Sequence, residues 1–368
     1  MFTPEGLAGE PAMLVSESGS TLPVQILSDG SAALILDHAA AGECRKYRLE
    51  PPAAAERTAS SDGMKVTVRN HTLSVYQDDS LVTRYCHSNK YARPFFFPVN
   101  APGGLCVTRS YPMQTVAGET TDHPHHKSLW IAHGDVSGVD NWSEEEGHGH
   151  TRQLNIDTIE EGPVLARFGT TSLWCDSRNE PLLIQKLSAT FWRGDVSCRL
   201  MDFDIQLTAN VRPDDLVFGD TKEGGILSVR VASALEAKRG GSIQNVYGGL
   251  QEAECWGKHS HWCSYSGEID IRPCGIAVFD HPDSFRSPTT WHVRDYGLMT
   301  ANPFGYSAFT NGRTNGSYIL RAGSSIAFKY RVIAHNDADF DSKCSARYLD
   351  FAFPPQVRVS GAPKNLIP

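Results

Sequence analysis

The chain has 368 residues, of which 40% are hydrophobic, and a formal net charge of −8. This length can bury a sizeable core, as one large β domain or as two smaller domains. The lysines and arginines are scattered and form no basic stripe, so we expect no nucleic-acid partner. No run of about 18 apolar residues occurs, which argues against a membrane span and a membrane partner.

The first residues and the cysteines indicate a compartment. The opening segment, MFTPEGLAGEPAMLVSESGS, lacks a basic start, an apolar stretch and a small-residue cleavage site, so we expect a cytoplasmic protein. The nine cysteines are dispersed, odd in number and without a C-x-x-C pair. This pattern favours reduced thiols over a disulfide framework or a structural zinc site.

Alternating apolar and polar residues predict strands along most of the chain. Residues 64–86 predict three short antiparallel strands, and residues 163–210 predict longer ones. Further strands are expected in GILSVRVASAL, CGIAVFD and SSIAFKYRVIAH, whereas no segment keeps helical periodicity over three turns. The fold class is therefore all-β: a large antiparallel β-sandwich, like the supersandwich folds, with little helix.

The segments between the predicted strands indicate the loops and the domain boundaries. Long loops are expected at residues 95–109, 112–149 and 280–316, and their aromatic residues, His, Pro and Gly make them functional rather than disordered. We expect residues 1–90 to add N-terminal strands to the sandwich, residues 91–350 to form the core that carries the site, and residues 351–368 to form a C-terminal tail. No linker marks a clean boundary.

The segment DHPHHKSLWIAHGD, residues 122–135, holds four histidines. If its backbone is extended, His123 and His125 point to one side and His126 to the other. A catalytic metal needs about three protein ligands, and Asp135 would complete a set with His123 and His125. Histidine is also the side chain that titrates near neutral pH. A metal site, an acid/base or substrate site, and a loop held by hydrogen bonds all remain open.

The segment WHVRDYGLMTANPFG, residues 291–305, predicts a polar strand face. Alternation places His292, Arg294 and Tyr296 on one side. Such donors would lose hydration against an apolar core, so this side should face solvent, a cleft or a carboxylate partner. The alternative is that Arg294 pairs with an acid only to fix a loop.

Two more segments supply polar candidates. In FGDTKEGG, the carboxylates of Asp220 and Glu223 flank Lys222, and such neighbours perturb one another's proton affinity as a general acid or base requires. A solvated turn is the alternative. RPFFFPVNAPGGLCVTR adds Arg109 behind three phenylalanines. Aromatic faces mixed with many donors and acceptors suit a sugar ring.

Several strings occur in the order of a known family. RPFFFPV, VTRSYPM, DHPHHKSLWIAHGDVSGVDNW, GDTKEGG, WGKHSHW, AVFDHP, WHVRDYGLMTANPFG and YRVIAH resemble the signatures of the family labelled PmoA or "methane oxygenase". The resemblance covers residues 93–335. It implies a soluble β-sandwich similar to galactose mutarotase and polysaccharide lyases, and a role in carbohydrate catabolism. Ser128 departs from it where relatives tend to have glycine, and Asn141 where an aromatic residue often precedes the tryptophan.

The predicted function is acid/base cleavage or rearrangement of a C–O bond in a glycoside or keto-glycoside, by a hydrolase or lyase. The alternatives are an oxygenase-type redox enzyme with a metal on His123, His125 and Asp135, and a carbohydrate-binding module without catalysis. One divalent metal ion is a candidate cofactor, the partner is a small carbohydrate, and a homo-oligomer is a further expectation.

The candidate residues fall into two groups, and the hypothesis requires both to meet at one place. The proposed catalytic residues are His125, Glu223, His292 and Arg294. The proposed substrate-binding residues are Arg109, His126, Trp130, Asp140, Trp142, Lys222, Tyr296 and Asn302.

Overall fold

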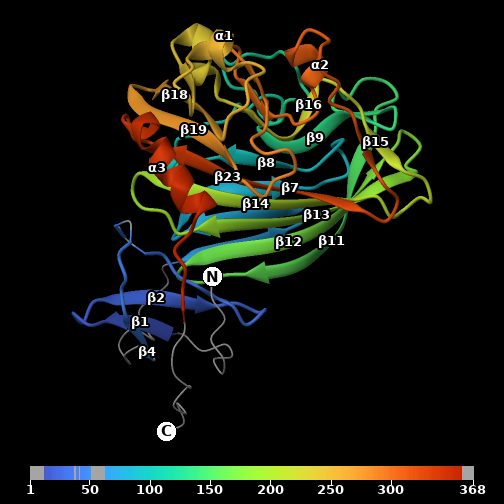
Figure 1. The fold of residues 1–368 in the computed structure, drawn as a ribbon. Helices are drawn as coiled ribbons and strands as arrows, with labels where there is room; N and C mark the ends of the chain where they lie inside the picture. Colours follow the sequence, from blue (N-terminus) through green and yellow to red (C-terminus); the bar gives the residue numbers. More distant parts are fainter. Residues whose placement is uncertain (1–11, 37–38, 41, 51–62, 359–368) are drawn as a thin grey trace.

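The computed structural model describes residues 12–36, 39–40, 42–50 and 63–358. In this part of the chain the strands form three sheets with antiparallel pairings, and the two large sheets pack face to face (Figure 1). The core between them includes Leu129 and Ile131 from one sheet and Phe203 and Ile205 from the other. The expected all-β sandwich is therefore confirmed.

The 11-stranded sheet has the order β20-β21-β16-β9-β8-β7-β6-β5, with β10, β15 and β22 attached beside β9. Its strands are β5 (Met64–Arg69), β6 (Thr72–Gln77), β7 (Ser80–Cys86), β8 (Phe95–Val99), β9 (Leu129–Val136), β10 (Val139–Asn141), β15 (Leu216–Phe218), β16 (Gly224–Arg230), β20 (Trp291–Arg294), β21 (Leu298–Ala301) and β22 (Tyr318–Leu320). The three short strands expected in residues 64–86 are β5, β6 and β7.

The 8-stranded sheet has the order β11-β12-β13-β14-β23-β19-β18-β17. Its strands are β11 (His150–Glu160), β12 (Leu165–Cys175), β13 (Pro181–Trp192), β14 (Cys198–Thr208), β17 (Ser242–Asn245), β18 (Trp262–Ile269), β19 (Arg272–Asp280) and β23 (Ser325–His335). The longer strands expected in residues 163–210 are β12, β13 and β14.

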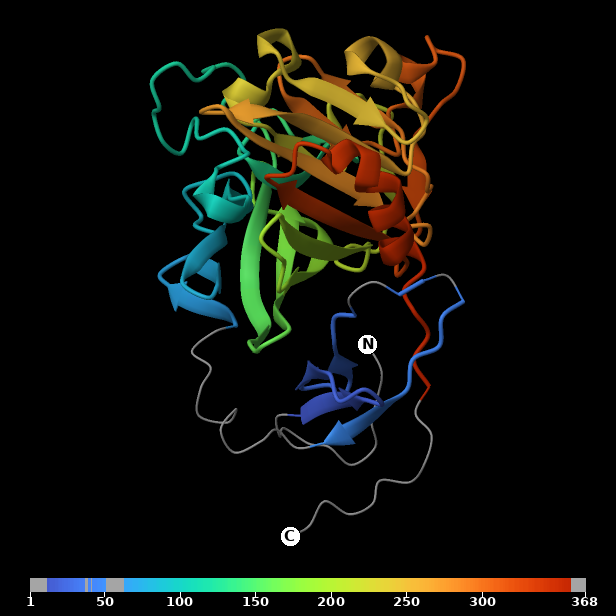
Figure 2. The same cartoon turned by 90° about the vertical axis from the view of Figure 1, so that its left-hand side faces the viewer.

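The N-terminal strands form a small sheet of their own. It contains β1 (Ala12–Ser16), β2 (Thr21–Ile26), β3 (Ala32–Ala33) and β4 (Tyr47–Glu50), and it lies below the sandwich in Figures 1 and 2. The expectation that all of residues 1–90 join the sandwich is thus corrected: only β5 to β7 do so. The sequence could not separate β1 to β4 from β5 to β7, because both groups of strands contain alternating apolar and polar residues.

Helices are few. They are α1 (Gln251–Cys255), α2 (Tyr306–Phe309), α3 (Phe340–Ala352) and the short 3₁₀ turns η1 (Pro102–Gly104), η2 (Ser233–Leu235) and η3 (Ala237–Arg239). The sequence did not predict α3, because its buried stripe is narrow: Phe340, Cys344 and Tyr348 pack with Trp262 on the outer face of the 8-stranded sheet. Within the described residues, no helix is long and apolar enough to span a membrane.

The three long segments expected as loops contain strands. The second half of the histidine-rich segment is β9, a central strand of the 11-stranded sheet. Leu129 and Ile131 of β9 belong to the main core, and Trp130 and Ala132 belong to a second apolar cluster on the opposite face. A strand buried on both faces reads as a continuous apolar run, so alternation could not reveal it.

Candidate functional site

The candidate site lies on the face of the 11-stranded sheet that turns away from the main core. On β20, Trp291 and Val293 enter that core, so His292 and Arg294 lie on the opposite face, as alternation predicted. The register carries this face across four strands: Trp130 of β9 is opposite Ser228 of β16, which is followed by Thr300 of β21 and His292 of β20. Residues far apart in sequence therefore share one surface of the sheet.

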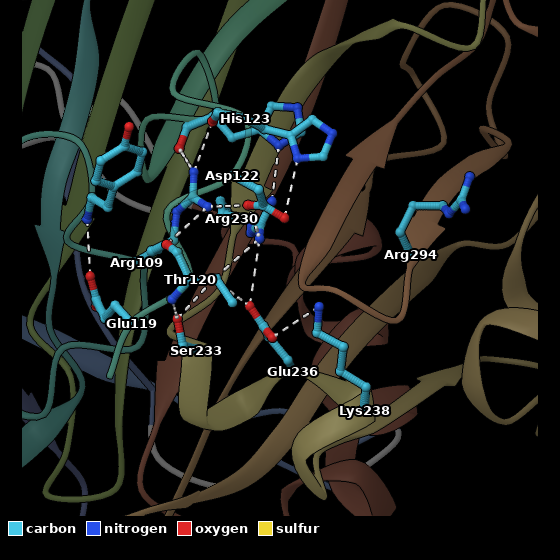
Figure 3. Close-up of polar contacts among 12 residues, drawn as sticks. Arg109, Glu119, Thr120, Asp122, His123, Arg230, Ser233, Glu236, Lys238 and Arg294 are labelled. Atoms are coloured by element: carbon cyan, nitrogen blue, oxygen red, sulfur yellow. Dashed lines mark hydrogen bonds and ion pairs between the residues drawn. The ribbon is translucent and has the colours of Figure 1, made fainter. Parts of the chain in front are cut away.

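Two buried arginines share one carboxylate beside this face (Figure 3). Arg109 donates to Asp122 Oδ1 at 2.6 Å, and Arg230 donates to the same oxygen at 2.7 Å. Both guanidinium groups are fully buried. Burial raises the pKa of Asp122, but the charges of Arg230 and Arg109 outweigh it and hold that pKa below its usual value. The carboxylate is thus ionised and fixed in position.

The negative charge on the other side of Arg230 comes from Glu236. Its carboxylate is fully buried, lies 3.5 Å from Arg230 and accepts a 2.7 Å hydrogen bond from Thr120. Arg109 also donates to the carbonyl oxygens of His123 and His126. Both buried guanidinium groups are therefore paired with carboxylates, as buried charges require, and Arg109 braces the segment that carries the histidines.

A stack of four rings runs along this segment. Tyr296 stacks on His123 at 5.1 Å between centroids, His123 on His126 at 4.8 Å, and His126 on Trp130 at 5.3 Å. Interplanar angles of 5°, 4° and 20° make the stack nearly parallel. Trp142 meets the ring of His126 from the side at 5.4 Å. Side chains from β9 and from three connecting segments are thereby joined.

The extended backbone assumed for residues 122–128 is wrong. His123 has a φ of 42° and Ser128 has a φ of 61°, both in the left-handed region. The turn brings His125 and His126 into contact at 4.4 Å between ring centroids, although alternation predicted opposite sides. Ser128 occupies the position where the resembled family tends to have glycine, and its left-handed conformation is the one that glycine adopts without strain.

The metal set expected on His123, His125 and Asp135 is not assembled. Asp135 lies near the far end of β9, where its Oδ1 accepts a hydrogen bond from the backbone of Gly138 at 2.8 Å. Six residues of strand separate it from the start of β9, about 20 Å. Across residues 12–36, 39–40, 42–50 and 63–358, no group of three or more His, Cys, Asp or Glu side chains is placed to hold a metal ion.

Two histidines of the site are held neutral. Burial, followed by the charge of Arg93, lowers the pKa of His125 to about 4. Burial, followed by the charge of Lys222, lowers the pKa of His292 to about 3. Trp256 donates to Nδ1 of His292 at 2.9 Å, so the ring proton of His292 is on Nε2. His292 is therefore a neutral hydrogen-bond donor.

Charged side chains surround Tyr296 at the edge of the site. The guanidinium of Arg230 lies 4.8 Å from its ring and that of Arg294 lies 5.6 Å from it. Arg294 also pairs with Glu252 of α1 at 3.0 Å, so the acid partner expected as its alternative role is present. Burial raises the pKa of Tyr296 to about 12, against the lowering effect of both arginines. The phenol is thus protonated at neutral pH.

Lys222 and Glu223 form an exposed ion pair at 2.7 Å. Their charges act on residues inside the site, since Lys222 lowers the pKa of His292 and Glu223 raises the pKa of Tyr296. Asn302 fixes this segment by donating to the carbonyl oxygens of Thr221 and Lys222. Asn302 therefore positions this segment, and the substrate contact expected for it stays a prediction.

Asp140 also has a structural role. Its Oδ1 accepts hydrogen bonds from the backbone of Trp142 at 2.7 Å and of Ser143 at 3.0 Å. This turn sets the place of Trp142 in the ring cluster. The substrate contact expected for Asp140 stays a prediction.

The comparisons with known proteins give a family but no activity. The sequence profile of a family described as "Family of unknown function (DUF6807)" matches residues 72–348. The chain belongs to this DUF6807 family. Its description assigns no function, so it lends no support to the methane-oxygenase label that the motifs suggested. No curated protein matches the chain.

Solved structures resemble the DUF6807 chain only distantly. Heparan sulfate lyase HepC from Pedobacter heparinus is 9% identical, with a TM-score of 0.34 over 76% of this chain and 36% of HepC. The Slr1438 protein from Synechocystis sp. PCC 6803 is 11% identical, with a TM-score of 0.34 over 73% and 97%. A GalM/aldose epimerase homologue from C. elegans is 8% identical, with a TM-score of 0.32 over 75% and 100%. The chain thus spans about a third of HepC, and scores this low decide nothing about substrate.

Sequence reasoning missed four charged residues of this DUF6807 site: Arg93, Asp122, Arg230 and Glu236. Arg230 could have been predicted, because it ends the apolar strand GGILSVR. An arginine in a buried strand needs a charged partner, since arginine is almost never fully buried unless it is paired. Asp122 is the first residue of the histidine segment, residues 122–135. Nothing local marks Glu236 as buried, although it pairs with Lys238 and Arg239, which follow it closely. Its hydrogen-bond partner Thr120 comes from a distant segment.

Proposed function

We propose that this DUF6807 protein is a carbohydrate-active enzyme that cleaves or rearranges a C–O bond in a glycoside or keto-glycoside by acid/base chemistry. The observation that carries the proposal is the trio Asp122, His123 and Tyr296. An accessible histidine is paired with a carboxylate that two buried arginines fix, and it lies against a protonated phenol.

His123 is the general base of the proposed reaction. Its Nδ1 lies 3.3 Å from Asp122 Oδ2, and its side chain is 41% exposed. Among the described residues its Nε2 has no hydrogen-bond partner. A carboxylate on one ring nitrogen orients the imidazole and favours its protonated form after proton transfer. This role replaces the metal-ligand role expected for His123, and it moves the base from His125 and Glu223.

The chemistry follows from the donors around Tyr296. With a keto-glycoside, His123 takes the proton from the carbon next to the ketone, and the C–H electron pair forms an enolate with its negative charge on the carbonyl oxygen. The enolate then re-forms the C=O bond, and its electron pair makes a C=C bond as the C–O bond on the next carbon breaks. The departing oxygen takes a proton from the phenol of Tyr296. The Nε2–H of His292 and the guanidinium of Arg294 are the donors for the carbonyl oxygen, where negative charge develops.

The test is turnover of a panel of glycosides and their 3-keto forms by the whole chain and by two variants, His123→Gln and Tyr296→Phe. We expect product from the unchanged protein and a loss of about 100-fold or more in kcat in each variant, the usual contribution of a positioned acid or base. His281→Asn is the matched control, because His281 also pairs with an aspartate, at 3.6 Å, but packs on Phe351 of α3.

Three results would overturn the proposal. One is the absence of product from every compound with folded protein, and another is equal loss of activity in the control. The third is sugar binding without turnover, which would favour the carbohydrate-binding module. Activity abolished by a chelator and restored by a divalent ion would instead favour the metal-dependent alternative.

A further inference from the structure

The short helix α1 contacts both of the donors that the proposed reaction needs at the carbonyl oxygen. Oε1 of Glu252, near the start of the helix, lies 3.0 Å from Nε of Arg294. Trp256, which follows the last residue of the helix, donates from its indole nitrogen to Nδ1 of His292 at 2.9 Å. One turn of chain, at the end of the sandwich opposite the small N-terminal sheet (Figure 1), therefore holds two side chains of β20.

The spacing of these contacts matches the geometry of the two elements. Glu252 and Trp256 are four residues apart, and the backbone N–H of Trp256 donates to the carbonyl oxygen of Glu252 at 2.8 Å. They therefore lie on one side of a helical turn, about 6 Å apart along its axis. His292 and Arg294 are two residues apart on one face of a strand, about 6.6 Å. The backbone that follows α1 also donates to the first carbonyl of β20 at 2.8 Å, so the two elements are joined along their length.

The carboxylate of Glu252 is fixed at both oxygens. Oε1 pairs with Arg294, and Oε2 accepts from the backbone N–H of Asp295 at 2.7 Å. The side chain of Arg294 is 32% exposed, and a long side chain that is partly exposed samples many rotamers unless a partner holds it. Glu252 thus restrains the guanidinium from its Nε side and leaves the two Nη groups pointing away from this contact.

The ring of His292 is fixed by the second contact. Nδ1 accepts from Trp256, so Nε2 carries the proton of the neutral ring. In the described part of the chain Nε2 makes no hydrogen bond, and unlike Nε2 of His126 it is not closed off from solvent. Phe309 packs against Trp256 and His292, with ring centroids 5.1 and 6.3 Å apart, and limits the rotation of both. The Nε2–H is thus held in one direction with no acceptor from the protein.

We propose that Glu252 and Trp256 are positioning residues, which act through Arg294 and His292 to direct both donors at the carbonyl oxygen of the substrate. This inference rests on the proposed function, because that oxygen belongs to the keto-glycoside. Donors that are fixed before the reaction stabilise developing negative charge without reorganising. Loss of their orientation should therefore slow the step on which the charge develops more than it weakens substrate binding.

The first measurement needs no turnover. Nitrogen-15 NMR of the full chain at neutral pH reports which ring nitrogen of His292 carries the proton. We expect the proton on Nε2 in the unchanged protein and a mixture of both forms in Trp256→Phe, because Nδ1 has then lost its donor. Trp192→Phe is the matched control, since the indole of Trp192 also donates to a side chain, Asp202 at 2.7 Å, but on the other large sheet. It should leave the signals of His292 unchanged. If Trp256→Phe does not fold, Trp256→Leu makes the same test.

The second measurement is steady-state kinetics with a keto-glycoside that the unchanged protein turns over. We expect Trp256→Phe and Glu252→Gln each to lower kcat about ten-fold and to change KM by less than about two-fold. In protein that already carries Arg294→Gln, the change Glu252→Gln should have no further effect, since it acts through Arg294. Glu254→Gln is the matched control on the same helix, because Glu254 accepts from the backbone of Leu250 at 2.9 Å. It should leave kcat and KM unchanged.

The outcomes separate this inference from the proposed function. A proton on Nδ1 of His292 in the unchanged protein, or the same form in Trp256→Phe, overturns the role of Trp256. An equal loss in Glu252→Gln with and without Arg294→Gln, or an equal loss in Glu254→Gln, overturns the role of Glu252. Normal kcat in both Glu252→Gln and Trp256→Phe overturns the inference and leaves the proposed function standing. The expected form of His292 with no turnover of any compound overturns the proposed function and the carbonyl role together.

Discussion

Asp280, at the end of β19, is a buried carboxylate that the proposed reaction does not use. It is fully buried, accepts a 2.8 Å hydrogen bond from the backbone of Thr289, and its Oδ1 has no partner among the described residues. Burial raises its pKa from 3.8 to about 7. Folding therefore favours the protonated acid, and the folded state loses stability as pH rises from about 4 to 7.

The first prediction is that Asp280→Asn stabilises the protein at pH 8. Asparagine can still accept from Thr289 but carries no charge, so the variant avoids the cost of ionising a buried acid, at most about 4 kcal/mol for such a shift. Most of the gain should be lost near pH 4, where the native acid is protonated in the folded state and about half protonated in the unfolded chain. Thermal unfolding from pH 4 to 8 measures it. An equal gain at both pH values would contradict the assignment.

Asp283 supplies the control for that prediction. It is close in sequence, but a hydrogen bond and the charge of Lys329 lower its pKa. Asp283→Asn should therefore give no gain at pH 8. A gain equal to that of Asp280→Asn would show that removal of any negative charge from this segment is enough.

At the residue scale, the sequence predicted which side chains lie close together, but it predicted their individual roles less well. Arg109, His126, Trp130, Trp142 and Tyr296 do lie together in the structure. The unpredicted part is long-range, since the buried Arg230 contacts His126, which lies 104 residues away in the sequence.

At the element scale, the glycine pair that begins β16 fixes how closely the strands approach. Gly225 has a φ of 131°, and a Cβ there would lie 2.5 Å from Thr300 Cγ2 and 2.7 Å from the carbonyl oxygen of Ala301. Only glycine allows both this conformation and this contact. The close approach of β16 and β21 therefore requires glycine at this position.

The second prediction is that Gly225→Ala destabilises the protein by more than Gly138→Ala. Gly138 also has a positive φ, 82°, but a Cβ there would meet nothing within 4 Å. Gly138→Ala should therefore cost only conformational strain, about 1 kcal/mol, and Gly225→Ala should cost at least about 2 kcal/mol because the strands must also separate. Urea denaturation measures both. Equal losses would mean that β16 can shift without cost.

The same scale shows which elements a sequence reveals. Strands buried on one face, such as β5 to β7, alternate clearly and were predicted. Strand β9 is buried on both faces, and α3 buries only every fourth side chain from Phe340 to Ala352, so neither pattern stands out. The site depends on β9, and because β9 is buried on both faces, the sequence alone predicts a loop there.

At the scale of the whole molecule, the small N-terminal sheet is attached to the sandwich through Gln25, and also through Ser28 and Asp29, which contact Glu160 and Arg167. The side chain of Gln25 accepts from the backbone N–H of Val164 at 3.1 Å and of Leu165 at 2.9 Å, and it donates to the carbonyl oxygen of Glu161 at 3.2 Å. Leu27 packs with Val164 and Leu165 in a separate apolar cluster. In both views the sheet lies at the end of the sandwich opposite α1 and α2 (Figures 1 and 2).

The last prediction is that Gln25→Ala loosens this sheet without impairing the site. The change leaves the buried N–H groups of Val164 and Leu165 without acceptors, at about 1–3 kcal/mol each. We therefore expect faster proteolytic release of a fragment containing β1 to β4, with ligand binding unchanged.

Gln77→Ala is the control: Gln77 makes a similar pair of hydrogen bonds to the backbone of Gly194, but within the sandwich. It should lower the melting temperature without speeding that release. If both variants release the fragment at the same rate, attachment through Gln25 is refuted; if Gln25→Ala weakens binding, the small sheet supports the site after all.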